Sequence, residues 1–357
     1  MRVAVVGASG NVGTALLRRL GDDPAITSVV GIARRPPPRA VIDTYDLPAP
    51  YDVATWSRCD VAAPGPDDRA IERLAHLLTG ADAVVHLAWA LTPRHDRTVQ
   101  RRTNVLGMRR LAAAATRAGV PQLVVASSAG VYSPSPDEQP RSESWPTGGV
   151  RSSGYSADKV AVERVLDEAE RSHPDLVVAR VRPALVLQAA AGHQLTRNLL
   201  GSLFPVRRLE RELPVLPWPQ GLRFQAVHAD DLASAFREVI VRRQRGAFNV
   251  AAGDVLHGED LAVLVAGGHQ RVIPVSLARA VVAAAWHARL MPAGPGWFDL
   301  AMSVPVLDSA RARHLLGWRP TRSSAESVVE VVDGIARGAG TASPPLRPRH
   351  GTAPRSS

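Results

Sequence analysis

The stretch VVGASGNVG, residues 5–13, places glycines at positions 7, 10 and 13, directly after an apolar run. At a strand-to-helix junction the first glycine permits the tight turn, the second lets the backbone approach a pyrophosphate, and the third lets the helix pack closely. The N-terminus of that helix then faces the negative charge. Any tight turn recruits glycine, but this position favours a dinucleotide site made by Gly7, Gly10, Asn11, Val12 and Gly13.

Outward from this loop, short apolar runs alternate with helical patterns. The runs are rich in Val, Ala and Leu without polar alternation, as expected of strands covered by helices on both faces. The alternation predicts βαβ units, and so an α/β fold with a Rossmann-type doubly wound parallel sheet. The expected strands are residues 2–7, 28–33, 58–61, 83–88, 122–128 and 176–182, and the expected helices are 11–20, 67–79, 95–118 and 155–171.

The pattern loosens after about residue 185 and returns to a Rossmann-like form in two later pieces, 223–240 and 246–251. We therefore predict one unit over 1–335. Its Rossmann core would comprise 1–185 and 223–251, and a small substrate-binding lobe would comprise 186–222 and 252–335. The remaining 338–357 is rich in Gly, Pro, Ser and Arg and predicts a disordered tail.

The end of the second predicted strand bears on the choice of cofactor. An NAD site usually keeps an acid there for the ribose 2′-hydroxyl, whereas a 2′-phosphate is bound by arginine. This strand ends GIARRPPP, with Ala33 in the place of the acid and Arg34 and Arg35 after it. The pattern favours NADP(H). The alternative is an NAD(H) site that has lost its acid, with both arginines solvated.

The segment GYSADK, residues 154–159, holds the only lysine of the chain. Every other basic residue that carries a full charge is arginine, so Lys159 is a candidate for a position that a guanidinium cannot fill. Tyr155 lies four residues earlier and so shares one helix face with Lys159. A cation within about 4 to 6 Å lowers the pKa of a phenol from about 10, so we expect Lys159 to favour the phenolate.

Two serines, Ser127 and Ser128, close the fifth predicted strand, at the sheet edge where open α/β folds bind ligands. Serines after a strand are commonly caps. Together with Tyr155 and Lys159, however, they offer a hydroxyl that could orient a substrate carbonyl. This combination points to an acid–base site on a carbonyl or alcohol.

At this point the chain resembles the extended short-chain dehydrogenase/reductase family, the NAD(P)-dependent epimerase/dehydratase group, over about residues 1–320. The resemblance implies a Rossmann domain with a C-terminal substrate lobe. It also implies that Tyr155 is the catalytic acid/base, Lys159 its electrostatic partner and ribose ligand, and Ser128 the hydroxyl on the reacting oxygen. The motifs that carry it are GASGNVG, CDV, VVHLAW, NVLG, SSAGVY, YSADK, the RP at 182–183, VHADDLA, FNVA and LLGWRP.

The same matching implies further cofactor contacts. Asn104 falls at the family's helix asparagine, which serves the lysine through water. Asp60 is alternatively a cap at the end of a strand, and His86, inside an apolar strand, is interpreted as a satisfied core histidine and left out of the site. The implied contacts are Asp60, Val61, Leu87, Ala88, Trp89, Asn104, Ser127 and Pro183, in addition to Tyr155 and Lys159.

Departures from the family pattern narrow the reaction. Ala129 and Gly130 stand where sugar-nucleotide dehydratases carry an Asp-Glu pair, which disfavours dehydration. The leading hypothesis is hydride transfer between NADP(H) and a carbonyl or alcohol substrate. A nucleotide-sugar 4-epimerase with bound NAD is the first alternative, and a non-catalytic dinucleotide-sensing regulator is the second.

The substrate should be a small molecule, but its identity stays open. VRPALVLQ lacks the asparagine that sugar-nucleotide epimerases show after the sixth strand, which favours a less polar carbonyl compound. Arginines could still hold a diphosphate. Tryptophans could line an apolar pocket or simply pack in the core. The arginines are Arg207, Arg208, Arg211 and Arg223, and the tryptophans are Trp145, Trp218, Trp286 and Trp297.

Charge and apolar patterning bound the partners and the location. The net charge of +10 comes from scattered arginines without interleaved aromatics, so we expect no nucleic-acid partner. The best apolar stretch, 276–292, carries Arg279, His287 and Arg289 and predicts an amphipathic helix, so no membrane partner is expected. A single cysteine, Cys59, fits a cytoplasmic location. Homodimer formation is an expectation from the family.

Overall fold

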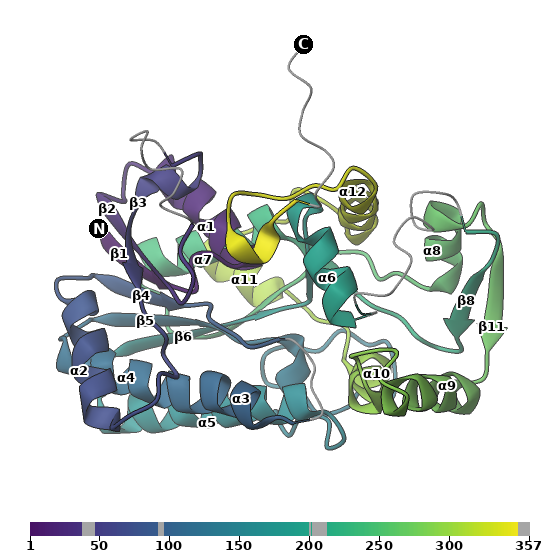
Figure 1. Ribbon diagram of the computed structural model, residues 1–357, viewed down its shortest axis with the longest axis horizontal. Helices are drawn as coiled ribbons and strands as arrows, with labels where there is room; N and C mark the ends of the chain where they lie inside the picture. The colour runs from purple at the N-terminus through teal and green to yellow at the C-terminus, as the bar shows by residue number, and fades with distance from the viewer. Residues whose placement is uncertain (38–46, 92–95, 200, 202–212, 349–357) are drawn as a thin grey trace, which may run out of the picture.

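A seven-stranded parallel sheet forms the centre of the computed structural model, which describes residues 1–37, 47–91, 96–199, 201 and 213–348 (Figure 1). The strand order is β10-β6-β5-β4-β1-β2-β3, so the chain reverses direction across the sheet between β1 and β4, where such sheets bind ligands. The predicted Rossmann-type sheet is confirmed. Its strands are β1 Arg2–Val6, β2 Ser28–Ala33, β3 Ala54–Arg58, β4 Ala83–His86, β5 Gln122–Ala126, β6 Val177–Pro183 and β10 Gly246–Val250.

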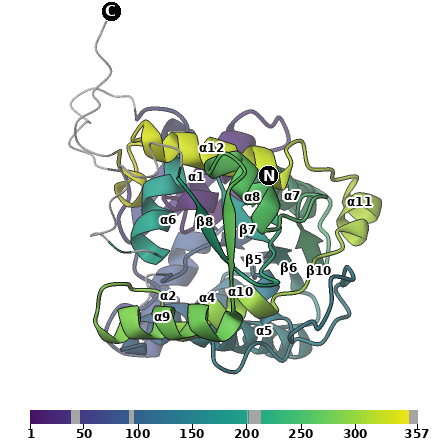
Figure 2. The ribbon, with the colours of Figure 1, turned by 90° about the vertical axis from the view of Figure 1, so that its right-hand side faces the viewer.

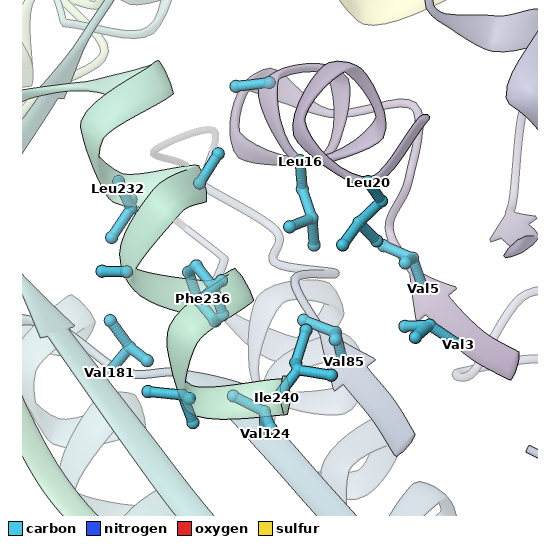
Figure 3. Close-up of a cluster of buried hydrophobic side chains, with 14 of the residues drawn as sticks. Val3, Val5, Leu16, Leu20, Val85, Val124, Val181, Leu232, Phe236 and Ile240 are labelled. Atoms are coloured by element: carbon cyan, nitrogen blue, oxygen red, sulfur yellow. The ribbon is translucent and has the colours of Figure 1, made fainter. Parts of the chain in front are cut away.

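Helices cover both faces of this sheet, as the apolar strands predict. The face formed by Val3 and Val5 packs on α1 (Asn11–Gly21) and α7 (Ala229–Val241), and Figure 3 shows Leu16 and Leu20 meeting Phe236 and Ile240 over the strands. The opposite face packs on three helices. They are α2 Asp67–Leu78, α4 Gly107–Arg117 and α5 Gly154–Ser172.

The third strand differs from the prediction. It was expected at 58–61, but β3 is Ala54–Arg58, and Cys59 and Val61 are buried in the loop after its carboxyl end. As an edge strand, β3 pairs only with β2 and has just one fully buried residue, Ala54, so it lacks the apolar run by which its inner neighbours were recognised.

The predicted helix over 95–118 is three segments in the described chain. They are α3 Thr98–Arg101, a π-helical turn η3 over Arg102–Leu106, and α4. Residue 95 lies outside the described residues. The π-helical turn buries Asn104 and Val105. Such turns inside helices are frequent at functional sites.

A second lobe follows β6, and Figure 2 looks onto its outer end. Two small parallel pairs build it, β7 (Leu185–Leu187) with β9 (Ala226–His228) and β8 (Leu216–Pro219) with β11 (Gln270–Ile273). Among the described residues, no helix is long and apolar enough to span a bilayer. Besides α7, the helices after β6 are α6 Gly192–Leu199, α8 Gly258–Val265, α9 Val275–His287, α10 Pro295–Ser303, α11 Ala310–Leu316 and α12 Ser324–Ala336.

Short 3-10 turns occur along the described chain. Before β6 they are η2 Tyr51–Val53 and η4 Ala129–Val131, and after it η5 Ala189–Ala191 and η7 Pro344–Leu346.

The disordered tail predicted for 338–357 is wrong over its first part. Residues 338–348 pack back on the Rossmann core, with Ser343 and Leu346 buried. The Ser343 hydroxyl donates to the Ser9 carbonyl at 2.6 Å, inside the glycine loop. A composition rich in Gly and Pro gives no sign that one leucine and one serine find buried partners. Residues 349–357 lie outside the described residues.

Candidate active site

The glycine loop joins three strands. The Gly7 amide donates to the Ile32 carbonyl at 2.7 Å. Gly7 has φ of 94°, and a Cβ there would lie 2.5 Å from the Ala88 amide nitrogen, so only glycine fits between β1 and the segment after β4. Within the described residues, no side chain caps the first amides of α1, and a Cβ at Gly10 would meet only the Gly7 carbonyl. These residues fit the pyrophosphate of a dinucleotide.

Asn11, the first residue of α1, is held by a residue that the sequence analysis missed. The buried Gln188, just after β7, donates to the Asn11 carbonyl at 2.9 Å and also to its side-chain oxygen. Arg18 in turn donates to Gln188 at 2.9 Å. The contacts tie the start of the glycine-loop helix to the second lobe, across more than 170 residues of sequence that give no local signal.

Tyr155 and Ser128 lie together, as the sequence analysis expected. A hydrogen bond from Ser128 acts to lower the pKa of Tyr155, but burial dominates and raises it to about 12. Ser128 Oγ also accepts from the Gly130 amide at 3.0 Å. A Cβ at Gly130 would lie 2.9 Å from the Tyr155 ring, so the glycine found where dehydratases carry an acid also makes room for the tyrosine.

The first turn of α5 is anchored by two serines that the sequence analysis did not single out. Ser153 caps the helix by accepting from the Ser156 amide. The buried Ser156 hydroxyl donates to the Gly130 carbonyl at 2.6 Å and accepts from the Val150 amide at 2.7 Å. Ser156 therefore fixes the distance between Tyr155 beside it and the loop that carries Ser128.

Lys159 lies one turn along the helix, but its ammonium points elsewhere than expected. Nζ donates to the Ala126 carbonyl at 2.8 Å and lies 3.6 Å from the centre of the Trp89 ring, against 5.8 Å from the Tyr155 ring. Burial lowers the pKa of Lys159 to about 7. In the cofactor-free chain burial sets the high pKa of Tyr155, and the expected effect of Lys159 on that pKa stays a prediction.

Asn104 and Asp158 form a second polar group beside Tyr155. Asn104 accepts from the Ala90 amide at 2.8 Å and donates to Asp158 at 3.2 Å, while Arg97 pairs with the same carboxylate at 2.7 Å. Asn104 therefore holds the loop after β4 to α5. The link from this asparagine to Lys159 through water stays a prediction.

Beneath the site lies a buried ion pair between Glu163 and Arg182, with contacts of 2.5 and 2.8 Å. The Ser127 hydroxyl donates to Glu163 at 2.6 Å, so it faces this pair and not the cavity. Arg182 donates to the Tyr132 hydroxyl at 3.0 Å, which donates to Asn249 at 2.6 Å. The pair ties α5 to β6 and β10, and its carboxylate raises the pKa of Lys159 against the larger effect of burial.

His86 is buried at the end of β4, as the sequence analysis expected of a core histidine, but it is not satisfied. Neither ring nitrogen has a hydrogen-bond partner among the described residues. Burial and the nearby Lys159 charge lower the pKa of His86 to about 3, so the ring is neutral at physiological pH.

The remaining predicted cofactor residues lie at the carboxyl edge of the sheet. Arg34 and Arg35 are exposed after β2, and neither has an ion-pair partner within the described part of the chain. Asp60 accepts from the Ala62 amide at 2.9 Å, which is the capping contact weighed above. Val61 is buried, and Pro183 ends β6. Their contacts with a cofactor stay predictions.

A cavity of about 290 Å³ opens in front of Tyr155. Trp297 from α10 stacks on the tyrosine with ring centres 4.8 Å apart, and Trp89 meets it edge-on at 5.7 Å. Trp286 from α9 completes the aromatic wall, and the polar lining includes Arg97, Gln100, Asn104 and Asp158. Of the four tryptophans weighed from sequence, Trp286 and Trp297 line this cavity.

The other two pack elsewhere. The Trp145 indole donates to the Ser133 carbonyl and lies under the Arg141 guanidinium, and the Trp218 indole donates to the Leu222 carbonyl. Arg223, a candidate diphosphate ligand, lies 3.7 Å from Glu138. The arginines at 207, 208 and 211 lie outside the described residues.

Proteins of known family are similar to this chain in sequence. A sequence model of the NAD dependent epimerase/dehydratase family matches residues 3–251. A UDP-glucose 4-epimerase of Mycolicibacterium smegmatis is 28% identical over 341 residues, which are 93% of this chain and 98% of that protein. An uncharacterized protein of Mycobacterium tuberculosis is 26% identical over 260 residues, which are 71% of this chain but only 63% of that protein.

Solved structures share the fold. The UDP-glucose 4-epimerase of Thermus thermophilus in complex with NAD has a TM-score of 0.67 at 22% identity, with 94% of this chain and 99% of that chain covered. DesIV, a dTDP-glucose 4,6-dehydratase from Streptomyces venezuelae with NAD and TYD bound, has the same TM-score and identity, with 94% and 96% covered.

Proposed function

The chain belongs to the NAD dependent epimerase/dehydratase family, and from this premise we propose that it is an oxidoreductase of the extended short-chain dehydrogenase type. It would transfer hydride between a nicotinamide dinucleotide and a carbonyl or alcohol group of a small molecule. The observation that carries this proposal is the position of Tyr155, which is hydrogen-bonded to Ser128 and lines an aromatic cavity.

When bound, the dinucleotide supplies the hydride donor or acceptor. Gly7, Gly10 and the first amides of α1 would hold its pyrophosphate. A tyrosine with a pKa of about 12 is protonated at neutral pH, so Tyr155 is set to donate a proton to the oxygen of a carbonyl under reduction. Ser128 orients the same oxygen by hydrogen bonding.

For oxidation, Tyr155 must instead accept the hydroxyl proton, and its high pKa opposes this. A positive charge beside the phenol lowers that pKa. Lys159 would bind a ribose hydroxyl and supply such a charge. Its ammonium donates to the Ala126 carbonyl and lies over the Trp89 ring. The protonated phenol of the cofactor-free chain therefore suits reduction, and the charge of Lys159 would help the same residue to accept a proton in oxidation.

We assign NADP(H) as the preferred cofactor. Support comes from Ala33 at the end of β2, where no acid can bind a ribose 2′-hydroxyl, and from the exposed Arg34 and Arg35 after it. The two compared structures contain NAD, so NAD(H) stays the alternative cofactor. We further propose a cytoplasmic location and a homodimer, on the buried free thiol of Cys59 and the family expectation.

The second candidate is a nucleotide-sugar 4-epimerase, which the match to a UDP-glucose 4-epimerase over nearly the whole chain favours. The same tyrosine would remove the sugar hydroxyl proton and later return it, while the hydride leaves and returns within one turnover. Such an enzyme must retain its oxidised dinucleotide. The absence of an asparagine in the segment after β6, residues 184–188, argues against this substrate class.

Titration of the purified protein with NADPH and NADH, after release and identification of any retained cofactor, separates these candidates. We expect NADPH to bind more tightly, and Arg34→Ala to weaken NADPH by roughly tenfold while NADH changes little, because one charge-assisted phosphate contact is lost. Arg117→Ala, exposed in the last turn of α4, is the matched control. Tightly retained NAD, with UDP-glucose converted to UDP-galactose, would favour the epimerase and contradict the NADP assignment.

A further inference from the structure

Helix α9 (Val275–His287) buries none of its residues against the described part of the chain. The residues that share its outward face are apolar and exposed, with Leu277 at 55% and Val281 at 60% of their full exposure. This outward face comprises Leu277, Ala280, Val281, Ala284 and Ala288, where Ala288 is the C-cap.

Helix α9 is apolar on both sides, because its half-buried inner residues Ala278, Val282 and Trp286 are as apolar as its outward face. A helix on a globular protein normally turns its apolar stripe to the core and its charges to water. A helix of this length is marginal by itself in water and depends on packing for stability. The inner side of α9 meets α10, where Arg279 pairs with Asp299 at 2.7 Å. The apolar stripe outside therefore calls for a further partner.

Exposed apolar residues also lie just before and after the helix. Val272 on β11 is 56% exposed and Leu290, after the C-cap, is 64% exposed. Figure 1 shows β11 and α9 at the same outer end of the second lobe. The apolar surface thus lies at the end of the molecule opposite β1, β2 and β3 (Figure 1).

The stretch of sequence that forms this surface carries basic charge alone, and Asp299 of α10 neutralises only Arg279. Residues 261–298 contain no Asp or Glu, although the whole chain has 33 such residues. Arg271 and Arg289 are exposed, and neither has an ion-pair partner among the described residues. His287 is exposed at the end of α9. A partner that complements this surface has an apolar layer for the outward face and anionic groups for the surrounding cations.

We propose that α9 docks on an anionic lipid surface, with its outward face in the boundary between head groups and acyl chains. From the sequence alone, no membrane partner was expected. Among the described residues no helix can span a bilayer, and the docking of one helix needs none. The proposal concerns binding and goes beyond the proposed oxidoreductase function, whose failure would leave it intact.

A second copy of the chain fits this surface less well. A stable dimer interface uses roughly 20 to 30 residues a side, whereas the outward face offers five residues, three of them alanine. Two copies would also bring Arg271, His287 and Arg289 near their own counterparts, because a symmetric dimer joins identical patches. Anionic lipid instead satisfies the same cations.

Docking at α9 would also bring the cavity close to the lipid. Trp286, on the inner side of α9, lines the cavity in front of Tyr155. The cavity therefore lies behind a single helix, whose diameter with side chains is about 10 to 12 Å.

Flotation of the full-length protein with vesicles tests the proposal. One set is phosphatidylglycerol and phosphatidylcholine in equal parts, and the other is phosphatidylcholine alone. We expect binding to the anionic set, weakened by salt, and a loss of at least about tenfold in Leu277→Glu/Val281→Glu, because two apolar side chains no longer enter the lipid. Val329→Glu, at an exposed site on α12, is the matched control and should bind like the wild type.

Far-ultraviolet circular dichroism and dinucleotide binding establish that each variant is folded. A folded wild type that stays with the vesicle-free fraction overturns the proposal, and so does a double variant that floats as well as the wild type. Elution of the wild type as a dimer, with Leu277→Glu/Val281→Glu a monomer and neither bound to vesicles, would assign the surface to a second copy instead.

Discussion

At the scale of single residues, Lys159 differs most from its expected state. It is the only lysine of the chain, it is buried, and its nearest acceptor is the Ala126 carbonyl. The carboxylates of Asp158 and Glu163 raise its pKa, but burial lowers it more, to about 7. A lysine near that value can lose its charge at physiological pH, which would weaken its binding of a ribose.

Because no other lysine is present, isotope-labelled lysine gives a single side-chain resonance. We expect its titration midpoint near 7 in the cofactor-free protein, against about 10.4 for an ordinary lysine. The unfolded chain then binds the extra proton between these values, so this residue makes the free energy of unfolding rise with pH from about 7 to about 10. The rise should vanish in Lys159→Met. A midpoint near 10 would contradict the burial argument.

Glu163 and Arg182 are also buried, but each of these two charges is paired with the other. Replacing Glu163 by Gln removes the charge and leaves the Arg182 guanidinium buried without its carboxylate. We expect denaturant unfolding to show a loss of about 3 to 5 kcal/mol. Glu168→Gln, whose pair with Arg171 is exposed on the same helix, should change little. Equal losses in the two variants would show that the buried pair is not special.

At the scale of elements, the strands and the glycine loop could be predicted because their signals are local. An apolar run followed by spaced glycines predicts β1 and α1 with their true bounds to within a residue. The edge strand β3 could not be placed, because pairing on one side leaves it without a continuous apolar run. Tyr155 and Lys159 were recognisable from helical spacing, whereas Ser156 and Gln188 act through partners distant in sequence.

The segment 338–348 is an element that composition hides. Its Ser343 hydroxyl reaches the Ser9 carbonyl, and its Thr341 hydroxyl lies 2.6 Å from the Tyr51 hydroxyl, which in turn lies 3.0 Å from the Thr14 hydroxyl of α1. These contacts restrain both sides of the glycine loop. The segment therefore supports the proposed cofactor site from outside.

Ser343→Ala tests this support. Loss of one buried hydrogen bond leaves the Ser9 carbonyl without that donor, at a cost of about 1 to 3 kcal/mol. We expect a lower unfolding midpoint and weaker dinucleotide binding, with the wild-type turnover rate recovered at saturating cofactor. Ser276→Ala, at an exposed position on α9, is the control. Unchanged dinucleotide affinity in Ser343→Ala would show that the segment serves stability alone.

At the scale of the whole molecule, the chain combines a sheet that could be predicted from its pattern with a lobe that could not. An amphipathic helix was expected over 276–292, but α9 is Val275–His287 and is apolar on both sides, which local charge could not reveal. The aromatic cavity likewise joins Trp89 after β4 to Trp286 and Trp297 of the second lobe. These residues come from two lobes and lie far apart in sequence, so their meeting could not be predicted without the folded structure.

In the proposed reaction Tyr155 transfers the proton while the dinucleotide transfers the hydride. The most direct measurement is the oxidation of NADPH and NADH by a panel of carbonyl compounds, apolar and sugar-derived, in wild type and Tyr155→Phe. We predict turnover of at least one compound by the wild type and a loss of about 100-fold or more in the variant, with cofactor binding unchanged. Equal turnover in both proteins, or no dinucleotide binding by the wild type, would contradict the account.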